Sequence, residues 1–193
     1  MNPGPTQIPN PAQRLAVRAG LSRSAPFTVG WHQAIFEHYR ITNEETIRGF
    51  LPDQLVLDRH LDGSAYVSVV SFRMVGMAWR GLPLVGLRTY AQVNVRTYVH
   101  DGQRPGVFFL RNYVSNALAT LAGRVLYGMP YRYMAIDPII DLERGQFGYQ
   151  IPLPAGDHRV MGTRGARILG HEDDPSSLLF FLAERYPLFS ARR

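Results

Sequence analysis

Two residue types are missing from this chain, lysine and cysteine, and each absence excludes a class of chemistry. Every residue in the Lys+Arg total of 21 is an arginine. Without lysine, no side-chain amine can form an imine with a carbonyl substrate or with pyridoxal phosphate, and there is no P-loop lysine. Without cysteine there is no disulfide, no thiolate nucleophile, no thiolate-bound zinc and no iron–sulfur cluster.

Acidic residues are absent from the first thirty positions, and the excess positive charge is concentrated at the ends of the chain. The formal net charge is +6. Arg14, Arg18 and Arg23 lie near the start, and Arg192 and Arg193 are the last two residues. The interior is therefore close to neutral. A nucleic-acid-binding domain should carry its excess charge on a folded face, so we expect no nucleic-acid partner.

Long apolar runs are also missing. The longest nearly uncharged segments, such as Val107–Leu110 and Leu178–Ala183, are far shorter than the ~20 residues that a membrane-spanning helix needs. The N-terminus has no apolar core of a secretory signal. We therefore expect a cytoplasmic protein without a membrane partner. We also expect a disordered tail rich in proline and arginine over residues 1–25, and a single domain over residues 26–193.

The pattern along the chain predicts many strands and a few helices. Trp31–Tyr39 fits either a short helix or a buried strand, and Thr42–Glu45 resembles a capping box that opens a helix. Two hairpins are expected, one joining Gln54–Asp58 to Ser64–Arg73 through Asp62-Gly63 and one joining Arg88–Val99 to Gly106–Leu110 through Asp101-Gly102. The remaining expectations are a helix over Tyr113–Tyr127, strands over Tyr131–Ile136, Gln146–Ile151 and Arg159–Leu169, and a last helix from Asp174 to about Glu184. This order favours an α+β domain built around a curved sheet or barrel.

In the helix expected over Tyr113–Tyr127, apolar residues recur at helical spacing. They are Val114, Ala117, Leu118, Leu121, Ala122 and Val125. This spacing is the reason for expecting a helix over these residues.

Residues 88–99 alternate strictly, so this strand should present two different surfaces. One face holds the small and β-branched residues. The other holds Arg88, Tyr90, Gln92, Asn94, Arg96 and Tyr98. This second face has two amides, two phenols and two guanidiniums but no acid, which suits an anionic or carbonyl-bearing ligand. An ordinary solvent-exposed sheet face is the alternative interpretation.

Several strings of residues resemble a known family when they are taken in order. They are Leu51-Pro52, Leu57-Asp58, Asp62–Val67, Asn94–Val99, Pro105–Leu110, Leu126–Tyr131 and Glu184-Arg185-Tyr186. Together they resemble the uncharacterised YqjF-like family of the acetoacetate-decarboxylase-like superfamily. The resemblance covers most of Trp31 to Phe189, and Asn94–Val99 is its most specific element. It implies a mainly antiparallel, cone-like open β-barrel with an internal pocket and a few flanking helices.

The chain departs from the pattern of that superfamily at points that matter for chemistry. Acetoacetate decarboxylase uses a lysine as its imine-forming nucleophile, and this chain has no lysine. Gln92 stands where the family often has a glutamate, and Arg111-Asn112 stands where a small polar residue and an acid are more common. Relatives also continue past Glu184-Arg185-Tyr186, so the chain is expected to be a shortened member or a fragment.

No spacing among the six histidines supports a metal site, and no cofactor is expected. His171–Asp174 is interpreted as an acidic helix start, and Asp137, Asp141 and Glu143 as a solvated turn. His38 lies among apolar residues, where a core histidine is more common than a base.

We therefore expect a protein that acts on or binds a small carboxylate or carbonyl compound without lysine imine chemistry. A non-catalytic ligand-binding or partner-binding module is the alternative. The expected ligand-binding residues are Gln92, Asn94, Arg96, Tyr98, Tyr90, Arg111 and His38. Arg96 would hold a carboxylate, and Asn94 and Gln92 would polarise a carbonyl. No catalytic residue is assigned, and the oligomeric state is left open, a homo-oligomer included.

Overall fold

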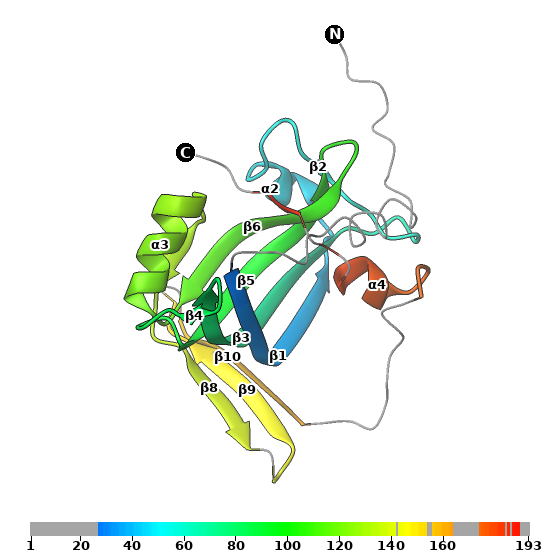
Figure 1. Cartoon of the computed structure of the whole chain (residues 1–193). Helices are drawn as coiled ribbons and strands as arrows, with labels where there is room; N and C mark the ends of the chain where they lie inside the picture. The colour runs from blue at the N-terminus through cyan, green and yellow to red at the C-terminus, as the bar shows by residue number, and fades with distance from the viewer. Residues whose placement is uncertain are drawn as a thin grey trace.

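A strongly curved sheet of eight strands forms the body of the molecule (Figure 1). The computed structural model describes residues 27–141, 143–153, 156–163, 174–183, 185 and 187–189. The tail expected over residues 1–25 and the segment 164–173 lie outside these residues. The main strands follow the order β1 (Phe27–Arg40), β3 (Tyr66–Trp79), β5 (Thr89–His100), β6 (Pro105–Val114) and β11 (Leu188–Phe189).

Three short strands complete this sheet. They are β2 (Val56–Leu57), β4 (Leu82–Pro83) and β7 (Tyr131–Tyr133), which pair with β5, β3 and β6 respectively. All the pairings are antiparallel except those of β6 with β7 and with β11. Within the described part of the chain, β1 and β11 end the order without pairing with each other, so the sheet is open.

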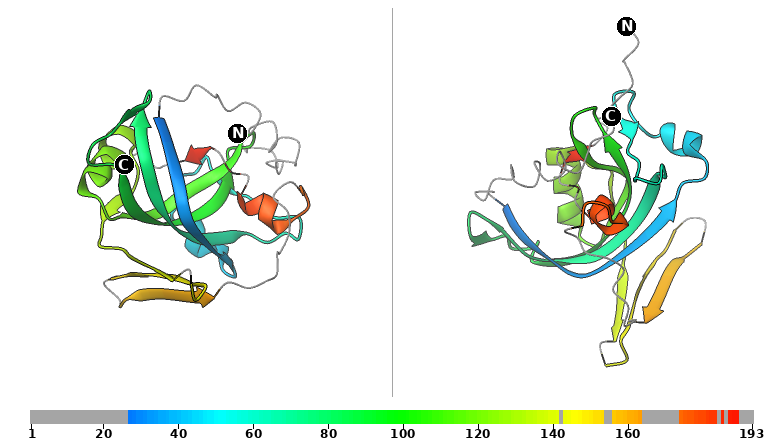
Figure 2. Two further views of the ribbon diagram at one scale, coloured as in Figure 1. Left: turned by 60° about the horizontal axis from the view of Figure 1, so that its bottom comes forward. Right: turned by 90° about the vertical axis from the view of Figure 1, so that its right-hand side faces the viewer.

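A second sheet and three helices pack around the first sheet. The small sheet has the order β10 (His158–Thr163), β9 (Gln146–Ile151) and β8 (Asp137–Asp141). The described helices are α2 (Glu44–Arg48), α3 (Ala117–Tyr127) and α4 (Leu178–Ala183). Figure 2 shows α3 and α4 on the concave side of the curved sheet and the small sheet on its convex side. The mixture of sheet and segregated helices confirms the α+β class.

Core contacts identify which side chains point to each side. Phe181 of α4 packs on Tyr66 and Tyr98, so Tyr98 faces the concave side. Tyr149 of β9 packs with Val93, so Val93 faces the convex side. Because side chains alternate along a strand, Gln92, Asn94 and Arg96 share the concave side with Tyr98.

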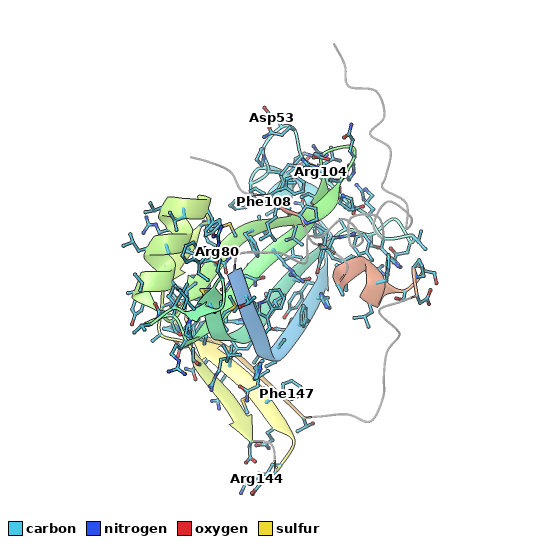
Figure 3. The ribbon with its side chains drawn as sticks, in the orientation of Figure 1. Asp53, Arg80, Arg104, Phe108, Arg144 and Phe147 are labelled. Carbon is cyan, nitrogen blue, oxygen red and sulfur yellow. The ribbon has the colours of Figure 1, made fainter. Side chains whose placement is uncertain are left out.

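Tight turns connect β5 to β6 and β8 to β9. Gly102 has a φ of 92° in the turn from β5 to β6, a conformation that glycine adopts without strain. Arg104 binds Asp101 at 2.7 Å at this turn, and Arg144 approaches Asp141 at 3.7 Å at the turn from β8 to β9. Figure 3 shows these two arginines at opposite ends of the molecule. The hairpin expected around Asp101-Gly102 is confirmed.

The hairpin expected around Asp62-Gly63 is wrong. β2 and β3 do not pair with each other, because both pair with β5, end to end along the same edge. Leu57 lies opposite Val99, and β3 takes over where Val67 lies opposite Thr97. Leu57 is buried in this position, and burial of its side chain favours the pairing of β2 with β5.

The ambiguous segment Trp31–Tyr39 is part of β1. Its alternation is hidden in the sequence because the register shifts between His32 and Ile35, where Gln33 has a φ of 56°. A bulge of this kind changes which face the following side chains occupy.

Two helix and turn predictions change in detail. The N-cap of α2 is Asn43, whose side chain accepts a hydrogen bond from the Glu45 amide, and Thr42 does not have that role. Asp137 and Asp141, expected in a solvated turn, bound strand β8, and the turn begins at Asp141. No helix in the described part of the chain is long and apolar enough to cross a membrane.

Candidate functional site

A layer of polar side chains, buried except for the half-buried His38, lies on the concave face of the main sheet. It consists of His38 from β1, Ser68 from β3, Asn112 from β6, and Gln92, Asn94, Arg96 and Tyr98 from β5. We call this set the polar layer. Adjacent strands bring these residues together because His38 lies opposite Ser68, Ser68 opposite Arg96, and Asn94 opposite Asn112.

A chain of hydrogen bonds runs through one side of the polar layer. The Nδ1 atom of His38 is 2.6 Å from Ser68 Oγ, which is 2.6 Å from the Tyr98 hydroxyl. Burial and the nearby Arg96 guanidinium lower the pKa of His38 to about 4, so its ring is neutral at pH 7. Burial raises the pKa of Tyr98, although Arg96 and Ser68 oppose that shift. Both groups are therefore uncharged near neutrality.

Arg96 is the buried cation of the polar layer, with 7% of its surface exposed. Its guanidinium lies over the rings of Phe36 and Tyr98, at 5.6 Å and 5.8 Å from their centres. Among the described side chains, no carboxylate forms an ion pair with Arg96, and its Nε has no hydrogen-bond partner. Glu143 is exposed, and the side chain of Asp137 lies outside the described set. A buried cation without a carboxylate is costly unless an anion or a polar group contacts it.

The amides of the polar layer leave further buried atoms unpartnered. Gln92 Nε2 donates to Asn112 Oδ1 at 2.8 Å. Within the described residues, Gln92 Oε1, Asn94 Oδ1 and Asn112 Nδ2 have no partner. Asn94 and Asn112 are almost completely buried. The layer therefore offers both donors and acceptors in one place, an arrangement that is rare in a purely structural core.

The structure brings six of the seven expected ligand residues to the concave face and leaves one apart. Tyr90 shares this face but packs against Val114 and Ala119, and burial raises its pKa to about 12. Arg111 lies opposite Val95, whose side chain faces the convex side, next to a register shift between β5 and β6. Its guanidinium lies over the ring of Phe50, at 6.0 Å.

Two members of the polar layer, Ser68 and Asn112, were not among the ligand residues expected from the sequence. Ser68 is a small hydroxyl residue on a strand face otherwise formed by Tyr66, Val70 and Phe72. A single hydroxyl residue among these large apolar side chains was the feature of the sequence that could have identified Ser68 as a member of the layer. Asn112 followed Arg111 at a position already noted as unusual, but its pairing with Gln92 depends on the register of β5 and β6.

Two of the family-like strings meet in a buried ion pair. Arg185 Nη2 lies 3.0 Å from Asp58 Oδ2, and both side chains are completely buried. The Arg185 guanidinium also lies over Phe181, at 4.3 Å, and over Tyr98, at 5.6 Å. This pair therefore supports the end of the polar layer formed by Tyr98. The described residues contain no cluster of three or more metal-ligating side chains.

The comparisons with known proteins agree with this architecture. Residues 28–193 match the DUF2071 family, described as an uncharacterized conserved protein. The uncharacterized protein YqjF of Bacillus subtilis is 27% identical over 173 residues, which cover 84% of this chain and 66% of YqjF. The expected resemblance to the YqjF-like family is confirmed.

Solved structures share the fold at lower identity. Acetoacetate decarboxylase from Legionella pneumophila has a TM-score of 0.54 and 14% identity, over 69% of this chain and 47% of that enzyme. An acetoacetate decarboxylase-like enzyme from Sphingomonas wittichii has a TM-score of 0.56 and 20% identity, over 78% of this chain and 61% of that enzyme. The chain thus spans between about half and about two thirds of the length of these proteins, and the likeness establishes an acetoacetate-decarboxylase-like fold.

Proposed function

The chain belongs to the DUF2071 family, and from that premise we propose that its polar layer binds a small carboxylate or carbonyl compound without lysine imine chemistry. The observation that carries the proposal is Arg96, a buried guanidinium with no carboxylate partner among the described side chains. A guanidinium binds a carboxylate through two parallel hydrogen bonds. A ligand carboxylate would therefore supply the missing counter-charge.

The unpartnered atoms narrow the chemistry of the ligand. Arg96 Nε and Asn112 Nδ2 are donors and suit carboxylate or carbonyl oxygens, whereas Asn94 Oδ1 and Gln92 Oε1 are acceptors. The acceptors suit a hydroxyl or enol proton. A small acid with a neighbouring carbonyl or hydroxyl group fits both sets. In this proposal the curved sheet acts as the cone-like open barrel expected from the sequence, and its interior holds the ligand.

Proton transfer would depend on the His38–Ser68–Tyr98 chain. Its three groups are linked by two hydrogen bonds of 2.6 Å, so a proton leaving the ligand near Tyr98 has a route to His38. Gln92 cannot serve as an acid or a base, because an amide does not titrate. Catalysis would therefore be proton exchange next to a carbonyl group, with His38 as the acceptor.

A non-catalytic binding module is the second candidate, and the His38 pKa of about 4 favours it. A general base is most effective when its pKa lies near the working pH. A ligand carboxylate beside Arg96 would reduce the positive field on His38 and so raise this pKa. The two candidates share the binding site and differ only in whether a proton moves.

Calorimetric titration with pyruvate, acetoacetate, lactate and acetate tests the binding. Arg96→Lys retains the positive charge but loses the two parallel donors of the guanidinium. We expect it to weaken the binding of these acids by about tenfold or more. Asn112→Leu should weaken the binding of pyruvate, acetoacetate and lactate more than the binding of acetate. Arg88→Lys is the control, because Arg88 is exposed and immediately precedes β5, outside the polar layer. Undiminished binding to a folded Arg96→Lys variant would refute the proposal.

Deuterium exchange separates catalysis from binding. Proton exchange at the methyl group of pyruvate in D2O, followed by NMR, should be accelerated by the wild type and lost in His38→Gln if the protein is catalytic. Binding without accelerated exchange would support the binding-module candidate.

A further inference from the structure

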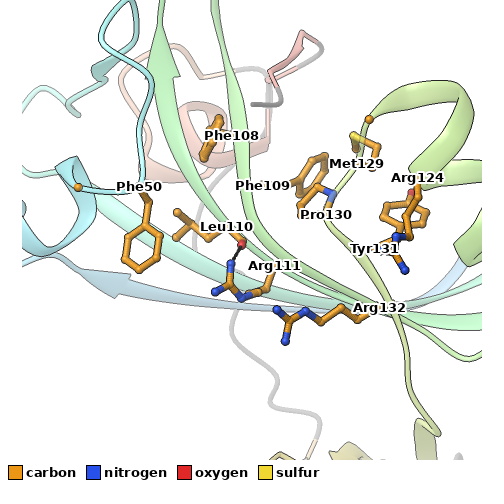
Figure 4. A pocket seen from close by; sticks show the side chains of 12 residues that line it. Phe50, Phe108, Phe109, Leu110, Arg111, Arg124, Met129, Pro130, Tyr131 and Arg132 are labelled. Carbon is orange, nitrogen blue, oxygen red and sulfur yellow. Dashed lines mark hydrogen bonds between the residues drawn. The ribbon is translucent and has the colours of Figure 1, made fainter. Parts of the chain in front are cut away.

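The outer edge of β6 contains a gap between two short parallel strands. β11 pairs with Val107 and Phe108, and β7 pairs with β6 from Asn112 onward. Between them, residues 109–111 have no neighbouring strand on that edge among the described residues. A cleft of about 580 Å³ opens over this gap (Figure 4). This volume lies within the range of small-molecule sites.

Three arginines from three different elements line the cleft. Arg111 comes from β6, Arg124 from α3 and Arg132 from β7, and Arg124 and Arg132 are exposed. No carboxylate belongs to the lining, and none of the three forms an ion pair within the described part of the chain. Arg111 Nη1 donates to the Leu110 carbonyl at 2.8 Å and so is held at the gap. The described lining of the cleft therefore concentrates positive charge without a carboxylate to balance it.

The remaining wall of the cleft is largely apolar. Phe50, Phe108, Phe109, Met129 and Pro130 belong to it. Figure 4 shows Phe50 beside Arg111 on one side, and Met129 and Pro130 across the opening. A ligand with only a charged group would leave this apolar surface in water, whereas a ligand with an apolar portion would cover it.

We propose that this cleft binds a small organic anion with two or more negative charges and an apolar portion, of which a phosphate ester is the simplest example. A monoanion would balance only one of the three guanidiniums in the cleft lining, whereas a phosphate carries up to two charges and accepts bidentate hydrogen bonds from arginine. The site is independent of the polar layer, because Arg111, Arg124 and Arg132 do not belong to that layer. Either proposal can fail without the other.

Calorimetric titration at low ionic strength tests the charge requirement. The probes are acetate, inorganic phosphate, pyrophosphate and phenyl phosphate. We expect pyrophosphate to bind at least tenfold more tightly than acetate, and phenyl phosphate more tightly than inorganic phosphate because of the apolar wall. Equal affinities for acetate and pyrophosphate in the Arg96→Lys variant, whose carboxylate site in the polar layer is weakened, would overturn the charge requirement. Equal affinities for inorganic phosphate and phenyl phosphate would refute the proposal that the ligand has an apolar portion.

Paired substitutions test the location. Arg124→Met together with Arg132→Met should weaken pyrophosphate binding by tenfold or more, and both side chains are exposed, so the fold should tolerate the change. The control replaces two exposed arginines outside the cleft, Arg80→Met with Arg88→Met, and so removes the same charge. Equal losses in both variants would show a non-specific ionic effect and refute the site. Arg96→Lys should leave pyrophosphate binding unchanged, and a loss there would contradict the independence of the two sites.

Discussion

At the scale of single residues, Asp58 and Arg185 form a completely buried ion pair. Both side chains have no exposed surface, and the pair joins the end of β2 to the segment after α4. Removing a charge from water is costly, and here each ion offsets the cost of burying the other. The pair therefore acts as a fixed connection between segments far apart in the sequence.

Asp58→Ala should destabilise the fold by about 3–5 kcal/mol, because it leaves the Arg185 charge buried without its carboxylate. Urea unfolding measures the loss. Replacing both partners with apolar residues, Asp58→Leu with Arg185→Met, should recover part of it. Arg144→Ala is the control, since the Arg144 side chain is 77% exposed and should leave the transition close to wild type. An equal effect of Asp58→Ala and Arg144→Ala would contradict this interpretation.

His38 should make stability depend on pH in the acidic range. Its pKa is lowered by burial and by Arg96 from 6.5 to about 4 in the folded protein. The unfolded chain therefore binds this proton first as the pH falls, and stability is lost between about pH 6.5 and pH 4. Urea unfolding at pH 7, 6 and 5 measures the effect. His38→Gln should be less sensitive to pH than the wild type, and an identical pH dependence would refute the assignment.

At the scale of elements, α3 is the helix whose packing differs most from its sequence pattern. The helical spacing of its apolar residues predicted a helix here, and α3 is that helix, but the side chains of Leu118, Leu121 and Val125 are exposed, Val125 by 72%. The buried residues of α3 are Ala119, Thr120 and Gly123. Close packing of the helix on Tyr131 selects small side chains at the contact, so the large apolar residues lie outside.

Gly123→Ala should therefore destabilise the protein by about 1–3 kcal/mol, because an added Cβ would overlap the Tyr131 ring. Denaturant unfolding checks this expectation. Gly49→Ala is the matched control. Its φ of −61° suits alanine, and the nearest atom to an added Cβ is the Glu45 carbonyl at 3.8 Å. The control should be neutral or slightly stabilising. A neutral Gly123→Ala would show that Tyr131 moves away at little cost.

At the scale of the whole molecule, the given sequence offers no lysine side chain for the imine chemistry that was considered above. The chain has the acetoacetate-decarboxylase-like fold but no lysine. Borohydride treatment with acetoacetate or pyruvate should therefore trap no side-chain adduct. Mass spectrometry of peptide digests checks this at every residue and separates any reaction at the N-terminal amine. A reduced adduct on an internal peptide would contradict the prediction.

The curved sheet itself was partly predictable, because some of its signals are local. Strict alternation over residues 88–99 and the Asp101-Gly102 turn located β5, the turn after it and the polar face of the strand. The bulge at Gln33 hid the alternation of β1. The pairing of β2 with β5 could not be predicted, because it depends on a strand more than forty residues away.

The residues alone therefore determined which chemistry is excluded and which side chains share one face of β5. These properties follow from residue identity and from the two-residue period of a strand. Tertiary structure decided that this face is concave and buried, that Ser68 and Asn112 join it, and that Arg111 lies apart at the edge of β6. It also decided which side of α3 is buried. These outcomes depend on strand register and on packing between distant segments, which no local pattern encodes.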